Sequence, residues 1–75
     1  MQKPARWSNF RFREIVAEYV HSERNREILI RKYCDNRTIG QLAEEFELSE
    51  TRIKTIIYDE GMKVFSIMAE KQKDD

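Results

Sequence analysis

The stretch TIGQLAEEFELSETRIKTIIY, residues 38–58, constrains the fold more than any other part of the chain. Its apolar residues recur three or four positions apart in two groups: Leu42, Ala43 and Phe46, then Ile53, Ile56 and Ile57. This spacing is typical of helices that bury one face. Because only a short segment separates the groups, the two helices must pack against each other across a tight turn. The arrangement predicts a helix-turn-helix.

Capping residues mark the start of both helices. Thr38 precedes the first, and Gln41 follows three residues later, as a capping box requires. Ser49 precedes the second, where its hydroxyl can accept a hydrogen bond from a free backbone amide. Glu47 occupies a turn position that often holds a left-handed glycine, and a left-handed non-glycine residue costs about 1–2 kcal/mol. The turn must therefore absorb that cost or adopt another geometry.

Further helical segments flank this stretch. Apolar spacing predicts one helix over residues 9–20 and another over residues 23–35, the latter capped by Ser22. The second helix of the helix-turn-helix continues at the same spacing to about residue 69. Gly61 leaves two outcomes open, either one long helix that is bent or broken there or a short fifth helix after it.

The chain is expected to form a single domain, an all-α bundle of four or five helices containing the helix-turn-helix. A chain of 75 residues buries only about 60% of its unfolded surface, so its helices must share a small core. The expected segments are a flexible arm (1–7), two supporting helices (8–37), the helix-turn-helix (38–58), a C-terminal helix extension (59–70) and a tail (71–75).

Two groups of apolar residues are compatible with either a core or a partner contact. Trp7, Phe10 and Phe12 can cover the core or form an exposed patch that binds a partner. Met62, Phe65 and Met68 can belong to the core or to the seam of a dimer.

Several classes of site are excluded by composition. Cys34 and His21 are the only residues of their types, so the chain has neither an intrachain disulfide nor a cluster of Cys and His metal ligands. No nucleophile lies near a base, and there is no glycine-rich phosphate loop. No apolar run suits a signal peptide or approaches the roughly 20 residues of a membrane span. The sequence predicts a cytoplasmic protein that is not an enzyme, with no cofactor, metal, membrane contact or small-molecule substrate.

The net charge is zero, but the charges are unevenly distributed along the chain. Residues 1–37 carry nine Lys/Arg and five Asp/Glu, a balance of +4, whereas residues 38–75 carry five and nine, a balance of −4. This asymmetry indicates a basic face and an acidic face if folding keeps the two halves apart.

The run NREILIRKYCDNRTIGQLAEEFELSETRIKTI follows a longer pattern. An R-E-x-L helix ends in a tyrosine, and a short turn leads to T-x-x-x-[IL]-A-x-x-[FL]-x-[LV]-S-x-x-R-[IV]-[KR]. This pattern resembles region 4 of bacterial sigma factors, which recognises the upstream promoter element, and covers residues 24–65, 42 of the 75. The DNA-binding half of the Mor-type phage activators is similar in its LA…LSE…I core. The resemblance implies a stand-alone transcription regulator of a kind found on phages and mobile elements.

By this resemblance, the second helix of the helix-turn-helix enters the major groove of double-stranded DNA. Arg52 is expected to bond guanine O6 and N7 together, and Lys54 to contact a second base or a phosphate. Glu50 is expected to accept from cytosine N4 or to stabilise the helix N-terminus. The predicted DNA-binding residues are Arg37, Thr38, Ser49, Glu50, Thr51, Arg52, Lys54, Thr55 and Tyr58. Because a neutral chain binds DNA weakly, a homodimer partner or RNA polymerase is expected as well.

A second function stays open, that of a protein-interaction module which has kept the helix-turn-helix shape but contacts RNA polymerase or another regulator instead of DNA. Zero net charge, the acidic second half and Glu50 favour it. Such a module would lack salt-sensitive DNA binding, because that sensitivity comes from neutralising phosphates. It would expose an apolar patch, expected around Phe10, Phe12, Phe65 and Met68.

Overall fold

The computed structural model describes residues 9–73, with side chains as far as residue 70. Over this range the chain forms four helices and no strand: α1 (Asn9–Tyr19), α2 (Glu23–Tyr33), α3 (Ile39–Phe46) and α4 (Glu50–Lys73). The expected all-α bundle is therefore confirmed, with four helices. The predicted arm, residues 1–7, lies outside the described residues.

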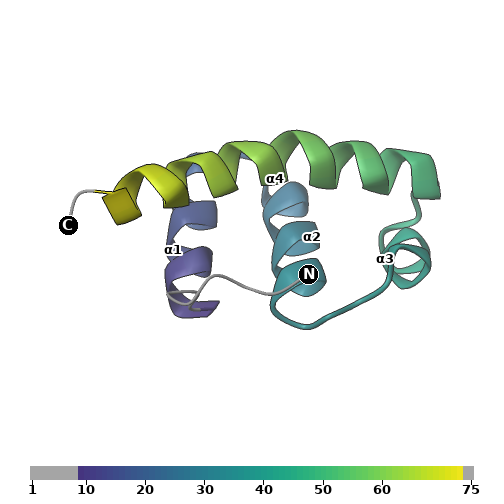
Figure 1. Ribbon diagram of the computed structural model, residues 1–75. Coiled ribbons are helices and arrows are strands. Elements are labelled where there is room, and N and C mark those ends of the chain that lie inside the picture. The colour runs from purple at the N-terminus through teal and green to yellow at the C-terminus, as the bar shows by residue number, and fades with distance from the viewer. Residues whose placement is uncertain (1–8, 74–75) are drawn as a thin grey trace.

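The longest helix, α4, runs along one side of the molecule, and the other three helices lie beneath it (Figure 1). It contacts all three of them. A helix of 24 residues extends about 36 Å, which accounts for most of the molecule's 41 Å length. α4 is thus the element that joins the other helices into one body.

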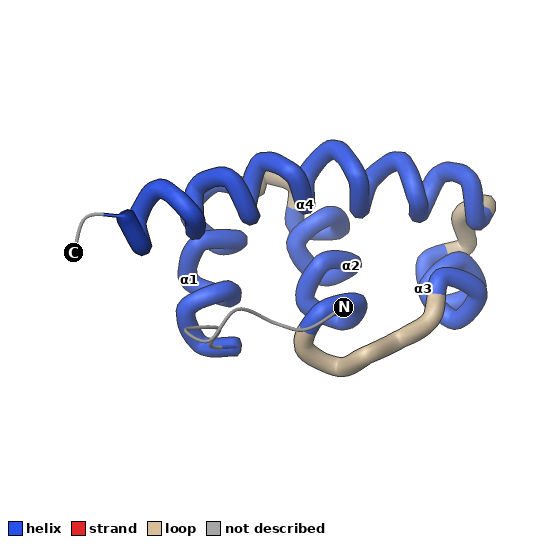
Figure 2. The backbone as a smooth tube through the Cα atoms, viewed as in Figure 1, coloured by secondary structure: helices blue, strands red, loops and turns tan. Residues whose placement is uncertain are grey.

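The first two helices begin and end within two residues of the boundaries expected from the sequence. Figure 2 shows the loops that join them to their neighbours. Ser22 caps α2, as predicted, because its hydroxyl accepts from the backbone amide of Asn25 at 3.2 Å. The guanidinium of Arg26 donates to the carbonyl of Val20 at 2.8 Å, which satisfies a group just past the end of α1.

The larger part of the core lies between α1, α2 and the second half of α4. Its buried residues are Phe12, Ile15, Val16, Val20, Leu29, Val64 and Met68. Phe12 packs edge-on against Tyr33, with ring centroids 5.6 Å apart, and Phe65 packs edge-on against Tyr33 at 5.1 Å. Burial of each such side chain contributes about 1.5–3 kcal/mol relative to exposure.

A second, smaller cluster lies between α2, α3 and the first half of α4. Its buried residues are Ile28, Leu42, Ile53 and Ile56, with Ile39, Ala43, Phe46, Leu48 and Ile57 packed against them. The neighbouring residues Ile28 and Leu29 of α2 belong to different clusters, so α2 is the wall that the two share. This small cluster holds α3 and the start of α4 together.

The glycine in α4 neither breaks the helix nor starts a fifth one. Gly61 is buried, and a Cβ built there would lie 3.7 Å from Tyr33 Oη and 3.9 Å from Leu29 Cδ2. These are ordinary van der Waals distances, so α2 packs beside Gly61 and leaves room for a methyl group there. The helix then continues to Lys73, past the expected end near residue 69, because the last residues are good helix formers.

The apolar residues that were open to two interpretations divide between core and surface. Phe12 is fully buried, but Phe10, two residues earlier, points to the other side of α1 and is 71% exposed. Met68 is buried and Phe65 is partly buried, whereas Met62 is 55% exposed. The patch expected around Phe10, Phe12, Phe65 and Met68 is therefore wrong, because two of its four members lie inside the core. Trp7 lies outside the described residues.

Candidate nucleic-acid interface

The predicted capping box at the start of α3 is present. Thr38 Oγ1 accepts from the Gln41 amide at 3.1 Å, and Gln41 Oε1 accepts from the Thr38 amide at 2.9 Å. These two bonds use the side chain and the backbone amide of Thr38, one of the residues predicted to bind DNA. The exposed first turn of α3 is thus fixed by its own residues.

The turn between α3 and α4 absorbs the left-handed residue. Glu47 has φ 57° and ψ 45°, the left-handed helical region. Its amide donates to the carbonyls of Ala43 and Glu44, and the Leu48 amide donates to Ala43 at 3.0 Å. These bonds satisfy the last carbonyls of α3, as a left-handed helix end does. The expected geometry is therefore adopted by glutamate at a position that favours glycine.

Ser49 begins α4 as predicted, because its hydroxyl accepts from the Arg52 amide at 3.0 Å. From there, Ile53 and Ile56 point inward and are no more than 5% exposed. They pack on Leu42 of α3 and Ile28 of α2, so the first half of α4 is held along one side only. Its opposite side faces away from the described part of the protein.

All nine residues predicted to bind DNA are exposed. Seven of them are Ser49 and six residues in the first turns of α4. Within these turns, Thr51, Thr55 and Tyr58 lie three or four residues apart and form a single stripe. The Thr55 hydroxyl donates to the Thr51 carbonyl at 3.0 Å, so it is partly used within the helix. Arg52 lies on one flank of this stripe and Lys54 on the other, given 100° of rotation per residue.

The carboxylate of Glu50 leans toward α3 instead of along the stripe. A Cβ built at Gly40, in the first turn of α3, would meet Glu50 Oε2 at 3.4 Å. The carboxylate therefore lies beside the N-terminal turns of both α3 and α4, where helix dipoles favour a negative charge. Of the two roles expected for Glu50, this position favours stabilisation of a helix N-terminus.

The remaining cation of the predicted set is tied into an ion-pair network. Arg37 Nη1 lies 3.7 Å from Glu45 Oε1, and Arg31 Nε lies 2.8 Å from Glu45 Oε2. Arg31 also pairs with Glu27, and its guanidinium lies over the Phe46 ring, 5.4 Å from the centroid. The hydrogen bond to Glu27, with the nearby charge of Glu45, raises the pKa of Arg31.

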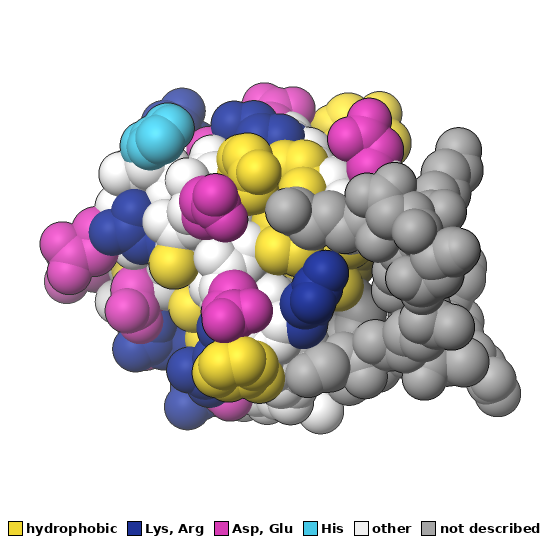
Figure 3. Space-filling model, turned by 90° about the vertical axis from the view of Figure 1, so that its left-hand side faces the viewer, with side chains coloured by type: hydrophobic (Ala, Val, Ile, Leu, Met, Phe, Trp, Pro, Cys, Tyr) yellow, Lys and Arg dark blue, Asp and Glu magenta, His cyan; other side chains and the backbone are white. Residues whose placement is uncertain are grey.

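These ion pairs join the basic first half of the chain to its acidic second half. The two halves therefore do not form a separate basic face and acidic face. On the face shown in Figure 3, acidic and basic side chains are interspersed around hydrophobic atoms. The candidate interface is similarly mixed, because Arg52 and Lys54 share the outer side of α4 with the exposed Asp59.

A shallow apolar groove borders the stripe, which the sequence patterns did not indicate. It has a volume of about 230 Å³ and is lined by Tyr33, Ile39, Lys54, Ile57, Tyr58, Gly61, Met62 and Phe65. Tyr58 and Met62, one helical turn apart, stand at its edge with 68% and 55% of their surfaces exposed. In the sequence, the groove could have been found from these two residues, because together with the inward-facing isoleucines they make the apolar face of α4 wider than burial against α2 and α3 requires.

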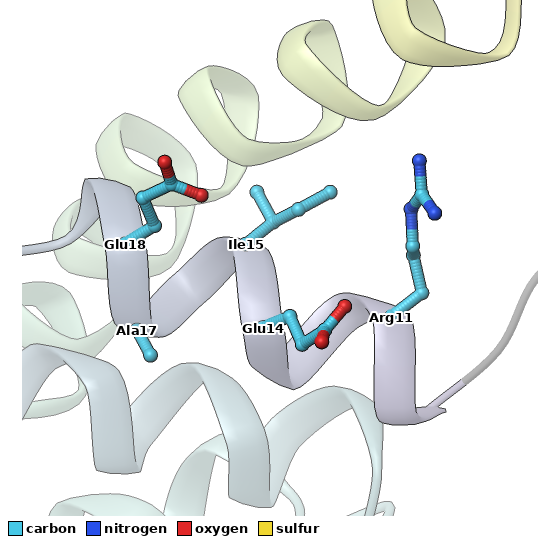
Figure 4. A pocket seen from close by; sticks show the side chains of 5 residues that line it. All are labelled: Arg11, Glu14, Ile15, Ala17 and Glu18. Atoms are coloured by element: carbon cyan, nitrogen blue, oxygen red, sulfur yellow. The ribbon is translucent and has the colours of Figure 1, made fainter.

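A second depression, about 530 Å³, lies along α1 (Figure 4). It is lined by Arg11, Glu14, Ile15, Ala17 and Glu18, and it contains none of the predicted DNA-binding residues. Among residues 9–70, no cluster of three His, Cys, Asp or Glu side chains could hold a metal ion. No helix within the described range is long and apolar enough to cross a membrane.

Comparison of the chain with protein-family models, curated proteins and solved structures gives no match.

Proposed function

We propose that this protein is a sequence-specific DNA-binding transcription regulator whose α4 enters the major groove with its first three turns. The observation that carries this proposal is that one side of those turns is buried and the other side is exposed. Ile53 and Ile56 are buried against α2 and α3, while every predicted contact residue from Ser49 to Tyr58 is exposed. A helix held from behind in this way suits insertion into a groove about 12 Å wide.

Within this proposal the contact residues have different roles. Arg52 has no ion-pair partner among the described residues, so its guanidinium is available to bond guanine O6 and N7. Lys54, on the opposite flank, contacts a phosphate or a second base. Glu50 positions the helix starts and does not contact a base, because its carboxylate lies against α3. The resemblance of residues 24–65 to sigma region 4 supports the same use of α4.

The test is a comparison of binding by Arg52→Ala with binding by a matched control. Duplexes selected by the wild-type chain from a random-sequence pool supply the target. Arg52→Ala should weaken target binding by about 1–3 kcal/mol and relax the preference at one base pair. Arg13→Ala removes the same charge from an exposed position on α1 and should leave binding within a few tenths of a kcal/mol. Equal binding of target by both variants would refute the assignment of Arg52.

A second candidate is a protein-interaction module that uses the same side of α4. The exposed Tyr58 and Met62, beside the apolar groove, favour it because aromatic side chains and methionine are enriched in protein interfaces. Salt dependence separates the two functions. If Arg37 and Lys54 each neutralise one phosphate, log K should fall with log[salt] at a slope of about −1.8. An interaction module would show no such DNA binding at low salt.

A further inference from the structure

Four charged residues form a single row along the outer side of α4. Arg52, Asp59, Lys63 and Glu70 are separated by seven, four and seven residues, which places them within about 40° of one another around the helix axis. All four are exposed, and their signs alternate along the row. Lys63 Nζ lies 3.3 Å from Glu60 Oε1 of its own helix, yet half of the lysine side chain stays accessible.

This row is complementary to its own antiparallel copy. Arg52 and Glu70 lie nine residues before and after Gly61, and Asp59 and Lys63 lie two residues before and after it. In an antiparallel pair of helices related by a two-fold axis, residues equally far from the axis face each other. An axis at Gly61 would place Arg52 opposite Glu70 of the second copy and Asp59 opposite Lys63 of the second copy. A parallel pairing in the same register would oppose like charges.

Met62 and Tyr58 lie about 80° and 120° around the helix axis from Arg52, near the middle of the row along the helix. Tyr58 and Met62 flank Gly61 and are mostly exposed, and the groove beside them continues onto Ile39 and Phe65. In the antiparallel register, Tyr58 of one copy lies beside Met62 of the other, and the contact repeats by symmetry. Helix pairs of this kind bury an apolar seam flanked by charge pairs.

We infer that a second copy of this chain docks antiparallel on α4, with the two-fold axis crossing the outer side of the helix at the height of Gly61. The seam consists of Tyr58 and Met62, and the charge row sets the direction and register. The same interface covers Arg52 and Tyr58, so the dimer and DNA compete for one face. That competition rests on the proposed function, whereas the dimer itself does not.

Charge reversal followed by mixing tests the dimer. Asp59→Lys opposes lysine to lysine at two symmetric positions, and Lys63→Glu opposes acid to acid. By sedimentation equilibrium over micromolar to millimolar concentrations, each variant alone should self-associate about tenfold more weakly than the wild type. An equimolar mixture should recover the association, because each lysine then faces an acid. A monomeric wild type over the whole range, or a mixture no more associated than its components, would overturn the inference.

Three controls separate this result from misfolding and from failure of the DNA proposal. Glu44→Lys changes the net charge as Asp59→Lys does, but at an exposed position on α3, and should leave self-association unchanged. Circular dichroism melts show whether each variant keeps its fold. Met62→Ser should abolish the dimer and, if DNA binds this face, leave the intrinsic DNA affinity of the monomer intact. If Met62→Ser loses the dimer and neither the wild type nor any variant binds DNA, the inferred self-association stands and only the proposed function is refuted.

Discussion

Glu47 offers a direct test of the turn that joins α3 to α4. Its backbone has φ 57° and ψ 45°, a conformation that costs a non-glycine residue about 1–2 kcal/mol. Glycine adopts it without that cost but loses roughly 0.5–1 kcal/mol more backbone entropy on folding. Glu47→Gly should therefore stabilise the fold by about 0.5–1 kcal/mol. For a domain of this size, that corresponds to an increase in Tm of roughly 2–8 °C.

The assay is urea unfolding followed by circular dichroism, with two matched controls. Glu47→Ala removes the same carboxylate but keeps a Cβ in the left-handed region, so it should give none of the gain that glycine gives. Glu44→Gly places glycine inside α3 and should destabilise by about 1 kcal/mol. If Glu47→Ala stabilises the fold as much as Glu47→Gly, the effect comes from the lost charge and the reasoning about the backbone is refuted.

Four other predictions follow from the core and the caps. Gly61→Ala should stabilise α4 by up to about 1 kcal/mol in thermal melts, because the new Cβ meets Tyr33 Oη at an ordinary 3.7 Å. Leu42→Ala should lower the free energy of unfolding by about 2–5 kcal/mol in urea, since this fully buried side chain joins α3 to α4. Thr38→Ala removes one bond of the capping box and should cost about 1 kcal/mol in the same assay. Burial raises the pKa of the Tyr33 hydroxyl in the folded protein. The stability that the neutral hydroxyl contributes should therefore be present below pH about 10 and be lost as the pH rises through the raised pKa of the folded state. Ultraviolet titration of the wild type, compared with Tyr33→Phe, checks this.

The features that local sequence determines were predictable. Serine and threonine caps are recognisable because the side-chain oxygen accepts a hydrogen bond from a free backbone amide two or three residues later in the chain. Ser22, Thr38 and Ser49 all cap as expected. The inward residues of α4 follow from helical spacing alone, and Ile53 and Ile56 are indeed buried. These are contacts within one helix or across one turn.

The features that depend on distant contacts were not predictable. The position of Gly61 within one continuous helix, packed beside Tyr33 and Leu29 of α2, could not be read from the spacing of α4 alone. The patch expected around Phe10, Phe12, Phe65 and Met68 is absent because Phe12 of α1 and Met68 of α4 are buried in the same cluster. Similarly, the pairing of Arg37 with Glu45 was not apparent, since neither residue lies at a helical spacing from the other.

The candidate interface was predictable as a set of exposed positions but not in its chemistry. All nine residues lie on the surface, yet Glu50 leans against α3 and Thr38 closes a capping box. The sequence pattern identified the side of α4 that points outward. It did not show which of those side chains are already engaged within the protein.

An NMR titration of the isotope-labelled chain with a mixed-sequence DNA duplex at low salt, repeated at moderate salt, tests directly whether α4 binds DNA. We expect the amide signals of Thr38 and of residues 49–58 to shift together, and the shifts to shrink as salt displaces the protein from the phosphates. Unchanged signals in residues 49–58 at low salt, while the rest of the spectrum shows a folded chain, would contradict DNA binding through α4.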